Sequence, residues 1–444
     1  MKYIICGIFL DRNWSFICGR RDLSLSVTWI VRLLMRQVLI LGQVILLQEV
    51  YRIMSCRKSE NKRKIAILLS SVPSAGGGHQ YAMLLAECLK ELSVQYFELI
   101  IFCTNKFWRG WCRNNGVRYY MIGEIKAIHM EFNSKFPILS HIYNSYKTEL
   151  GKIVRQEKID VLFISMQSYF PNLNTKIIAP VHDLMHRYEP EFSEVSEGYQ
   201  FREQMSKCQA RYAECLLMDS QIGKKQFIES YGKYMKKNRP YLVNLPFVVP
   251  PYIIETTEEY INVPEKYIFY PAQFWKHKNH INLIKAIQLL TGNIRDIHLV
   301  LVGSEKNCLK EIKKYIVDNK LENNITILGF VNNGNMVYLY KHAIAMVMPS
   351  YFGPTNIPPL EAMAAGCPVI VANKYAMPEQ VGDAGLVFDP DSPEEIAGCI
   401  KRVWIDDGLR KEMIEKGYQR IIGWDKKRFR HRIFKIIKRC FDKD

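Results

Sequence analysis

The sequence lacks several features that mark exported and metal-binding proteins. Its 12 cysteines are scattered along 444 residues and include no C-x-x-C pair. A disulfide framework would show paired cysteine spacings, and a structural zinc site would show clustered ligands. No D-x-D-like metal motif sits at a suitable strand end. We therefore predict a cytoplasmic protein with reduced thiols that requires no metal and no other cofactor.

A long uninterrupted hydrophobic run is also missing. Residues 23–50 are largely apolar, but two arginines interrupt them, and neither remaining piece reaches the roughly 20 apolar residues that span a bilayer. No small-residue cleavage site of a secretory signal peptide follows. Residues 48–50 can be encoded by a purine-rich ribosome-binding sequence, and Met54 comes shortly afterwards. We interpret residues 1–63 as an N-terminal extension and expect translation to start at Met54.

Acidic residues are too few to balance the basic ones, and the formal net charge is +17. Residues 425–444 contain nine Lys/Arg against three Asp, and residues 57–64 contain five Lys/Arg against one Glu. Such stretches fit a solvated surface equally well as peripheral contact with an anionic membrane. No RNP-type aromatic signature or zinc-finger spacing is present, so nucleic acid is not an expected partner.

Two halves of the chain alternate short apolar runs with helical segments, which is typical of parallel α/β sheets. Apolar runs predict strands at residues 65–70, 97–102, 160–164, 177–181 and 215–218, and again at 267–270, 298–302, 325–328, 344–348 and 368–371. We predict an α/β fold with two Rossmann-like, doubly wound domains, residues 64–250 and 251–424, facing a central cleft. Residues 425–444 are predicted to form a basic closing helix that crosses the domain junction.

Loops that follow predicted strands carry the first candidate site residues. Gly76, Gly77 and Gly78 precede a helix whose N-terminus favours an anion, although Gly-rich turns also serve packing alone. His182 ends an apolar strand and is either a ligand-facing residue or a structural one. Lys278 lies beside a predicted helix start, where a cation can hold a diphosphate, although surface lysines are abundant in this chain.

Residues 349–370 form the most informative loop. Their sequence, PSYFGPTNIPPLEAMAAGCPVI, predicts a strand, a polar loop, a helix, a glycine stop and a second strand. Pro358 or Pro359 suits the first helical turn, and Gly366 suits the position just past the helix end. Glu361 is then expected in the first turn at the mouth of the cleft, where a carboxylate can accept both hydroxyls of a ribose.

This loop resembles that of the family 4 glycosyltransferases, a large family of retaining enzymes with the GT-B fold. The resemblance extends from residue 64 to the C-terminus and is strongest over residues 267–389. It implies that Glu361 binds the donor ribose, that Lys278 holds the donor diphosphate, and that His182 lies beside the transferred sugar. The donor pocket that it implies also includes Gly76, Gly77, Gly78, Gly303, Ser304, Phe330, Val331, Thr355, Asn356, Ile357 and Pro358.

Two positions depart from the pattern of that family. Its first glutamate in this loop falls on Gly353, and the arginine that commonly precedes the phosphate lysine falls on Gln273, which we place among the donor-binding residues. The variant FGPTNIPPLE resembles a recognisable subgroup. Thr355, Asn356 and backbone amides are expected to replace the missing carboxylate in hydrogen bonding to the sugar.

The resemblance implies transfer of a hexose, such as mannose or glucose, from a nucleoside diphosphate sugar with retention of configuration. The expected acceptor is a saccharide or lipid-linked saccharide, as in surface polysaccharide biosynthesis at the inner face of the cytoplasmic membrane. Three alternatives stay open. They are a nonhydrolysing sugar-nucleotide epimerase, a non-catalytic sugar-nucleotide-binding subunit, and a dehydrogenase, for which only the Gly-rich turn speaks.

Overall fold

The computed structural model describes residues 62–73, 76–123, 136–167, 170–237, 240–353 and 356–442. The expected N-terminal extension up to residue 61, with the expected start at Met54, lies outside the described residues, as does Thr355. Within the described residues, no helix combines the length and the apolar character needed to cross a membrane.

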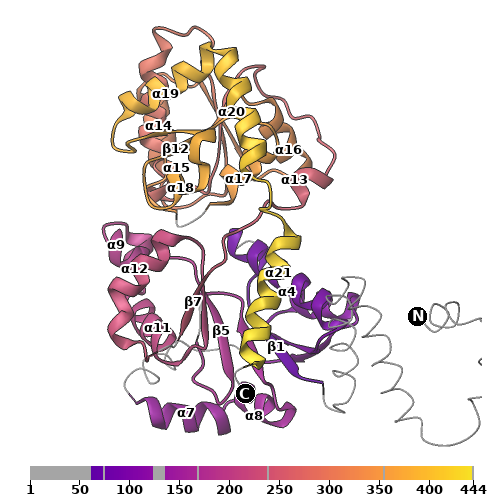
Figure 1. The fold of residues 1–444 in the computed structure, drawn as a ribbon. Coiled ribbons are helices and arrows are strands. Elements are labelled where there is room, and N and C mark those ends of the chain that lie inside the picture. Colours follow the sequence, from indigo (N-terminus) through magenta and orange to yellow (C-terminus); the bar gives the residue numbers. More distant parts are fainter. Residues whose placement is uncertain are drawn as a thin grey trace, which may run out of the picture. The chain divides into compact units, whose positions relative to one another are not determined.

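The first half of the described chain builds a seven-stranded parallel sheet in the order β3-β2-β1-β4-β5-β6-β7 (Figure 1). Its strands are β1 Lys64–Leu69, β2 Glu98–Cys103, β3 Arg118–Met121, β4 Val161–Ile164, β5 Lys176–Val181, β6 Cys215–Met218 and β7 Tyr241–Asn244. Its helices are α4 Gly77–Ser93, α5 Lys106–Asn114, α7 Pro137–Tyr146, α8 Glu149–Glu157, α9 Met185–Tyr188, α10 Ser193–Ser196, α11 Tyr199–Tyr212 and α12 Gln221–Tyr231.

The second half builds a six-stranded parallel sheet in the order β10-β9-β8-β11-β12-β13. Its strands are β8 Ile268–Pro271, β9 Leu299–Val302, β10 Ile325–Gly329, β11 Ala345–Met348, β12 Val369–Ala372 and β13 Gly385–Phe388. Its helices are α13 Tyr252–Glu255, α14 His280–Thr291, α15 Leu309–Asp318, α16 Asn333–His342, α17 Ile357–Ala364, α18 Met377–Val381, α19 Pro393–Ile405 and α20 Asp407–Arg420. Both sheets are therefore doubly wound, as the alternation of apolar runs predicts.

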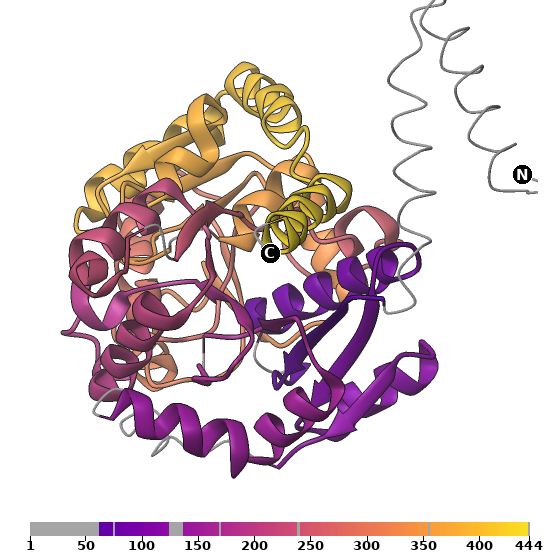
Figure 2. The same ribbon diagram turned by 60° about the horizontal axis from the view of Figure 1, so that its bottom comes forward.

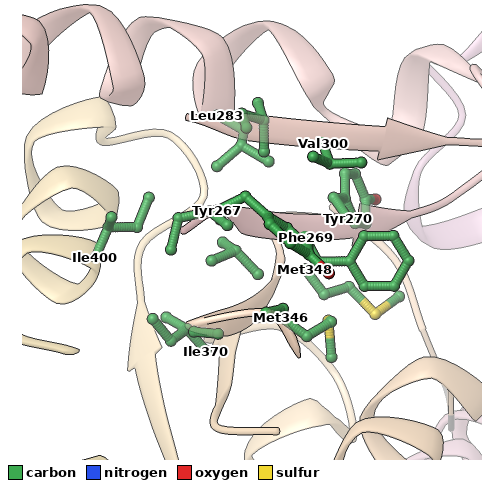
Figure 3. Packing of buried hydrophobic residues seen from close by; sticks show 14 of the residues in the cluster. Tyr267, Phe269, Tyr270, Leu283, Val300, Met346, Met348, Ile370 and Ile400 are labelled. Atoms are coloured by element: carbon green, nitrogen blue, oxygen red, sulfur yellow. The ribbon is translucent and has the colours of Figure 1, made fainter. Parts of the chain in front are cut away.

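The core of the second sheet is built around its central strand, β8 (Figure 3). Phe269 and Tyr270 are fully buried between side chains of the neighbouring strands, such as Val300 and Met346. The hydroxyl of Tyr270 donates to the backbone oxygen of Lys278 at 2.9 Å. A buried hydroxyl needs such a partner, and this bond anchors the loop after β8 to the core.

The strand order reverses between β1 and β4 in the first sheet and between β8 and β11 in the second. In doubly wound sheets the loops on either side of such a reversal leave in opposite directions and open a crevice at the carboxyl ends of the strands. The loops that follow β1, β8 and β11 carry most of the predicted site residues. The topology therefore determines where those residues gather.

The chain returns to the first sheet through its last helix, α21 Lys426–Phe441 (Figure 2). The crossing occurs at residues 421–425, where the amide of Val249 donates to the backbone oxygen of Trp424 at 2.9 Å. Phe429, Ile433 and Ile437 are buried in the core of the first sheet. The basic segment is thus a helix, as predicted, and it packs against the first sheet after the crossing.

Candidate active site

A cavity of about 960 Å³ lies between loops of the two sheets. Its wall combines the N-terminal end of α4, the segments after β5, β8, β9, β10 and β11, and the start of α17. Every predicted site residue that the structure describes lines this cavity, namely Gly76, Gly77, Gly78, His182, Gln273, Lys278, Gly303, Ser304, Phe330, Val331, Asn356, Ile357, Pro358 and Glu361. Residues that are far apart in the sequence are therefore brought to one site.

The two ring nitrogens of His182 differ in their hydrogen bonding. Its Nδ1 lies 3.0 Å from Oδ2 of Asp219, a carboxylate that is only 2% exposed. With the Nδ1 proton donated to Asp219, the other ring nitrogen, Nε2, has no partner among the described residues. Burial lowers the pKa of His182, but the charge of Asp219 and the hydrogen bond to it outweigh burial and raise that pKa above its ordinary value.

Aromatic neighbours fix the plane of the His182 ring. The ring stacks on Phe247 with 5.8 Å between centroids, and it packs perpendicular to the ring of Tyr81 with 4.7 Å between centroids. The backbone amide of His182 donates to Oε1 of Gln167 at 2.7 Å. A ring packed between two aromatic neighbours and hydrogen-bonded at one nitrogen presents Nε2 in one direction, which suits contact with a single ligand group.

Lys278 is, with Lys306, one of two lysines in the cavity wall. Its ammonium makes no hydrogen bond or ion pair among the described residues, and it stands just before α14. Burial lowers the pKa of Lys278 to about 8, while the charge of Asp183 acts in the opposite direction. An unpaired ammonium in a desolvated wall, with the N-terminal ends of α4 and α17 on the same cavity, forms a site for an anionic group.

The loop that carries Lys278 is bound to the first sheet by its neighbour, His277. The backbone amide and Nδ1 of His277 contact Oε1 of Glu194 in α10 at 3.0 and 2.8 Å. The amide group of Asn307 donates to the other oxygen of Glu194 at 2.9 Å. Burial alone would raise the pKa of Glu194, but these hydrogen bonds outweigh it and lower the pKa to about 2.

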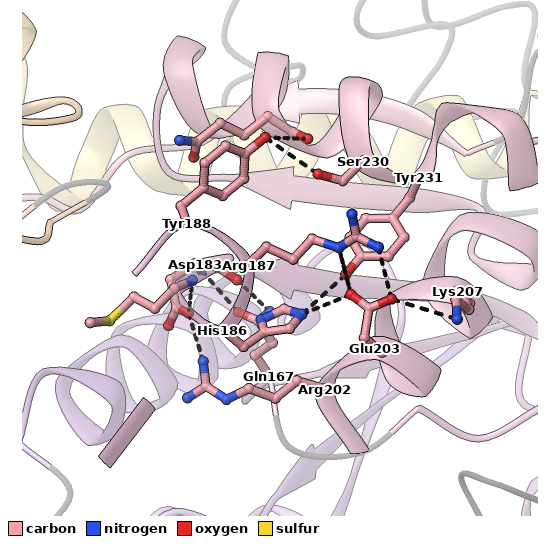
Figure 4. Close-up of polar contacts among 12 residues, drawn as sticks. Gln167, Asp183, His186, Arg187, Tyr188, Arg202, Glu203, Lys207, Ser230 and Tyr231 are labelled. Carbon is pink, nitrogen blue, oxygen red and sulfur yellow. Dashed lines mark hydrogen bonds and ion pairs between the residues drawn. The ribbon is translucent and has the colours of Figure 1, made fainter. Parts of the chain in front are cut away.

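The loop after β5 is held by a second polar network (Figure 4). Gln167 donates to the backbone oxygen of Asp183 at 2.9 Å, and Arg202 forms an ion pair with the Asp183 carboxylate at 2.9 Å. Further along the loop, Arg187 binds the buried carboxylate of Glu203, which also accepts from the hydroxyl of Tyr231. These contacts fix the backbone at His182 and Asp183 on the cavity wall.

Glu361 differs from its expected position. We expected it in the first turn of its helix, but α17 begins at Ile357, so Glu361 follows the first turn and is only 5% exposed. Its two oxygens accept hydrogen bonds from the hydroxyls of Tyr252 and Tyr340, each at 2.7 Å. A carboxylate has about four lone-pair sites, so Glu361 keeps acceptor capacity towards the cavity that it lines.

Gly353 and Asn356 form one packing unit. A Cβ atom on Gly353 would lie 1.8 Å from Nδ2 of Asn356, so any other residue at 353 requires the Asn356 side chain to move. The backbone of Asn356 is held by Gln380, whose Oε1 accepts from the Asn356 amide at 2.9 Å. The Asn356 side chain thus occupies the space beside the position where the resembling family has a glutamate.

We predict that Gly353→Ala destabilises the protein by about 1–3 kcal/mol, because the methyl group overlaps the buried Asn356 side chain. In an Asn356→Ser background, where that side chain is shorter, the same change should cost much less. Thermal unfolding of the wild type, the two single variants and the double variant measures this coupling as a double-mutant cycle. Equal costs of Gly353→Ala in both backgrounds would contradict the packing assignment.

Gly303 allows the loops after β8 and β9 to approach each other closely. A Cβ atom there would lie 2.0 Å from the backbone oxygen of Ala272, which cannot move without breaking the end of β8. Its neighbour Ser304 accepts at its backbone oxygen from the Phe274 amide at 3.2 Å. Gln273, between Ala272 and Phe274, accepts from the indole nitrogen of Trp275 at 2.9 Å while lining the cavity.

Sequence reasoning missed four residues that shape the site. Asp219 orients His182, Glu194 holds the Lys278 loop, and Tyr252 and Tyr340 bind Glu361. Asp219 directly follows the predicted strand at 215–218, so its place at a strand end was a usable signal. The other three lie within or beside helices, and nothing in the local sequence links them to the cavity.

Part of the chain is similar in sequence to known glycosyl transferases. Residues 255–420 match the family model of the glycosyl transferases group 1. O-antigen chain mannosyltransferase B of Escherichia coli is 32% identical over 152 residues, which are 34% of this chain. The match covers only 40% of that relative's length.

Two solved structures extend the likeness over both sheets. A glycosyltransferase from Rickettsia africae has a TM-score of 0.65 at 18% identity, covering 86% of this chain and 100% of its own. HepE from Anabaena, in complex with UDP and glucose, has a TM-score of 0.59 at 17% identity, covering 85% and 99%. With the two sheet orders, these likenesses show the GT-B fold.

Proposed function

We propose that this protein is a glycosyltransferase that transfers a hexose from a nucleoside diphosphate sugar with retention of configuration. The observation that carries the proposal is the unpaired ammonium of Lys278 beside helix N-termini in a cavity that Glu361 also lines. These groups match the diphosphate and the ribose of one ligand. The match of residues 255–420 to the group 1 family model supports the same assignment.

In the proposed reaction the acceptor hydroxyl attacks the anomeric carbon from the face that the diphosphate leaves. The bond between the anomeric carbon and the diphosphate oxygen breaks, and the departing diphosphate takes the acceptor's proton. Lys278 and the helix N-termini stabilise the charge that develops on the diphosphate, which is electrostatic catalysis. His182, through Nε2, hydrogen-bonds the transferred sugar, with Asp219 as its positioning residue.

We propose that this reaction uses no metal and no cofactor beyond the sugar nucleotide, because protein cations supply the positive charge. Among the described residues, no group of three His, Cys, Asp or Glu side chains is placed to hold a metal ion. Turnover of metal-free protein in EDTA should equal turnover with added magnesium. Activity that requires a divalent cation would contradict this part of the proposal.

The choice of donor and acceptor rests on relatives. One structural neighbour binds UDP and glucose, and one curated relative is an O-antigen mannosyltransferase. We therefore propose glucose or mannose as the hexose and a saccharide or lipid-linked saccharide of surface polysaccharide as the acceptor. The basic helix α21 supports work at the cytoplasmic face of an anionic membrane.

The test follows each sugar nucleotide by NMR with and without a membrane lipid extract that contains lipid-linked saccharides. A glycosyltransferase releases nucleoside diphosphate faster when the extract is present, and the sugar appears in the lipid fraction. Conversion of the sugar nucleotide without any extract would identify an epimerase instead. Donor binding without turnover over many acceptors would favour a non-catalytic subunit.

We predict that Glu361→Gln raises the KM for the donor by about tenfold and changes kcat little, because one charged acceptor for ribose hydroxyls is lost. Steady-state kinetics at saturating acceptor separates the two constants. Glu412→Gln, an exposed glutamate on α20, is the matched control and should leave both constants unchanged. An unchanged donor KM in Glu361→Gln would remove the ribose assignment.

The lowered pKa of Lys278 predicts a pH dependence. The diphosphate requires the ammonium form, which is present below the pKa, so kcat/KM should fall as pH rises through about 8. Lys278→Arg should be less active but flat over the same range, because a guanidinium stays protonated. An alkaline limb that persists unchanged in Lys278→Arg would show that another group titrates.

A further inference from the structure

Helix α7 (Pro137–Tyr146) turns its apolar side chains away from the protein. Ile138, Leu139, Ile142 and Tyr146 are 76%, 59%, 52% and 54% exposed. Their spacing places them along one face of the helix. A surface helix ordinarily buries its apolar stripe and exposes its polar one, so the polarity of α7 is reversed.

The inward face of α7 is polar, and hydrogen bonds hold it at the side chain of Ser140 and the backbone of Ser145. Ser140, Asn144 and Ser145 are at most 2% exposed. The amide group of Asn172 donates to Oγ of Ser140 at 3.3 Å, and Nε of Arg155 donates to the backbone oxygen of Ser145 at 2.9 Å. Rotation of α7 about its axis would bury the isoleucines, but it would also break these hydrogen bonds and leave their buried partners unpaired.

Exposed cations flank the apolar face. Lys147 follows α7 directly, and Lys152, Arg155 and Lys158 lie on or just after the neighbouring helix α8. The guanidinium of Arg155 stacks on the ring of Tyr146 at 4.0 Å from its centroid. Cations at the margin of an apolar face are the arrangement that anionic lipid surfaces attract.

The acidic side chains of the same region are already engaged. Oε2 of Glu149 accepts from the amide of Gly123 at 3.0 Å. Glu157 forms ion pairs with Lys64 and Arg118 at 3.0 and 2.6 Å. Over residues 147–158 four Lys/Arg face two Glu, one of which is already ion-paired, so this surface carries a net positive charge.

The C-terminal end of the basic helix α21 lies near the end of α8. Arg63 forms an ion pair with Asp160, just after α8, and its guanidinium lies over the ring of Phe441. Figure 1 shows α7 and α8 at the end of the first sheet remote from the second sheet. A surface that docks here leaves the cavity open.

We propose that α7 is a membrane-docking helix that inserts Ile138, Leu139, Ile142 and Tyr146 into the interfacial layer of an anionic bilayer. A bilayer covers the apolar face and neutralises the flanking cations at once. Tyrosine suits this layer because its ring is apolar and its hydroxyl is hydrated. The inference deepens the proposed function by naming the surface that meets the lipid bearing the acceptor.

The test is co-sedimentation of the full chain with vesicles of phosphatidylcholine, with or without phosphatidylglycerol. Wild-type protein is expected to bind the anionic vesicles. The variant Ile138→Asn/Ile142→Asn should bind about tenfold more weakly or worse, because two aliphatic side chains that insert into the bilayer are lost. The control Val317→Asn/Ile405→Asn removes two hydrophobic residues that are 59% and 65% exposed elsewhere, and should bind like wild type.

Thermal unfolding and size-exclusion chromatography complete the test. The α7 variant should unfold at the wild-type temperature, and Leu139→Ser/Tyr146→Ser serves as a second variant. Equal vesicle binding by wild type and both α7 variants, or no binding by wild type, overturns the proposal. If the wild type is a dimer that does not bind vesicles, and the α7 variants are monomers, the apolar face instead contacts a second copy of the chain. Since no sugar nucleotide is present, none of these results bears on the proposed transfer reaction.

Discussion

Replacement of Lys278 by alanine is expected to lower kcat by about 10³-fold, because the cation that stabilises the departing diphosphate is lost. The second lysine of the cavity wall, Lys306, has its ammonium over the ring of Trp275, whereas the ammonium of Lys278 has no such partner, and Gln273 is uncharged. The effect should be larger on kcat than on donor KM, because the negative charge on the diphosphate increases as its bond to the sugar breaks.

Lys276→Ala is the matched control for this prediction. Lys276 lies two residues away in the same loop, is exposed, and is absent from the wall of the cavity. Its removal tests whether the general positive potential of the loop is sufficient. Similar losses of kcat in Lys276→Ala and Lys278→Ala would contradict a specific role for Lys278, as would wild-type turnover in Lys278→Ala.

Replacement of Asp219 by asparagine is expected to lower kcat by about 10²-fold, with little change in shape or volume. Asp219 fixes the proton of His182 on Nδ1 and raises the pKa of His182, so its carboxylate controls what Nε2 offers to the sugar. An asparagine amide can instead donate to Nδ1, which reverses the tautomer.

A double-mutant cycle shows whether Asp219 acts through His182 or independently of it. In a His182→Ala background, Asp219→Asn should cost little further activity, because its partner is already gone. The dependence of kcat/KM on pH should also change in Asp219→Asn, because the carboxylate that raises the pKa of His182 is gone. Asp383→Asn, an exposed aspartate, is the control and should be neutral. If the loss of kcat in the double variant equalled the product of the two single losses, the proposed pairing of Asp219 with His182 would be contradicted.

The predictability of the strands follows from burial. Strands covered on both faces, such as β4 and β6, are apolar throughout and buried at every position, so a short apolar run identifies them. The sequence did not predict β3, β7 and β13, and all three are sheet edges with mixed burial. In such a strand some side chains are buried and others face solvent, so its residues alternate in polarity. Four residues are too few to show that alternation in the sequence.

The candidate site was predictable where it depends on strand ends. His182 and Gly303 lie directly after buried strands, and Lys278 lies in the loop that follows β8. Parallel topology brings such loops to one edge of each sheet. Glu361 shows the limit of that reasoning, since its hydrogen bonds to Tyr252 and Tyr340 depend on how α13 and α16 pack on α17. Likewise, the reversed polarity of α7 appears only when burial is known for each side chain.

The most direct test of the central claim is thermal unfolding of the full chain against a panel of UDP-, GDP- and ADP-sugars. A ligand that binds only the folded protein raises its unfolding temperature by mass action. We predict that one sugar nucleotide of the panel raises this temperature selectively, and that the rise shrinks in Glu361→Gln and in Lys278→Ala. No rise with any sugar nucleotide, from well-folded wild-type protein, would contradict the assignment of the cavity as a donor site.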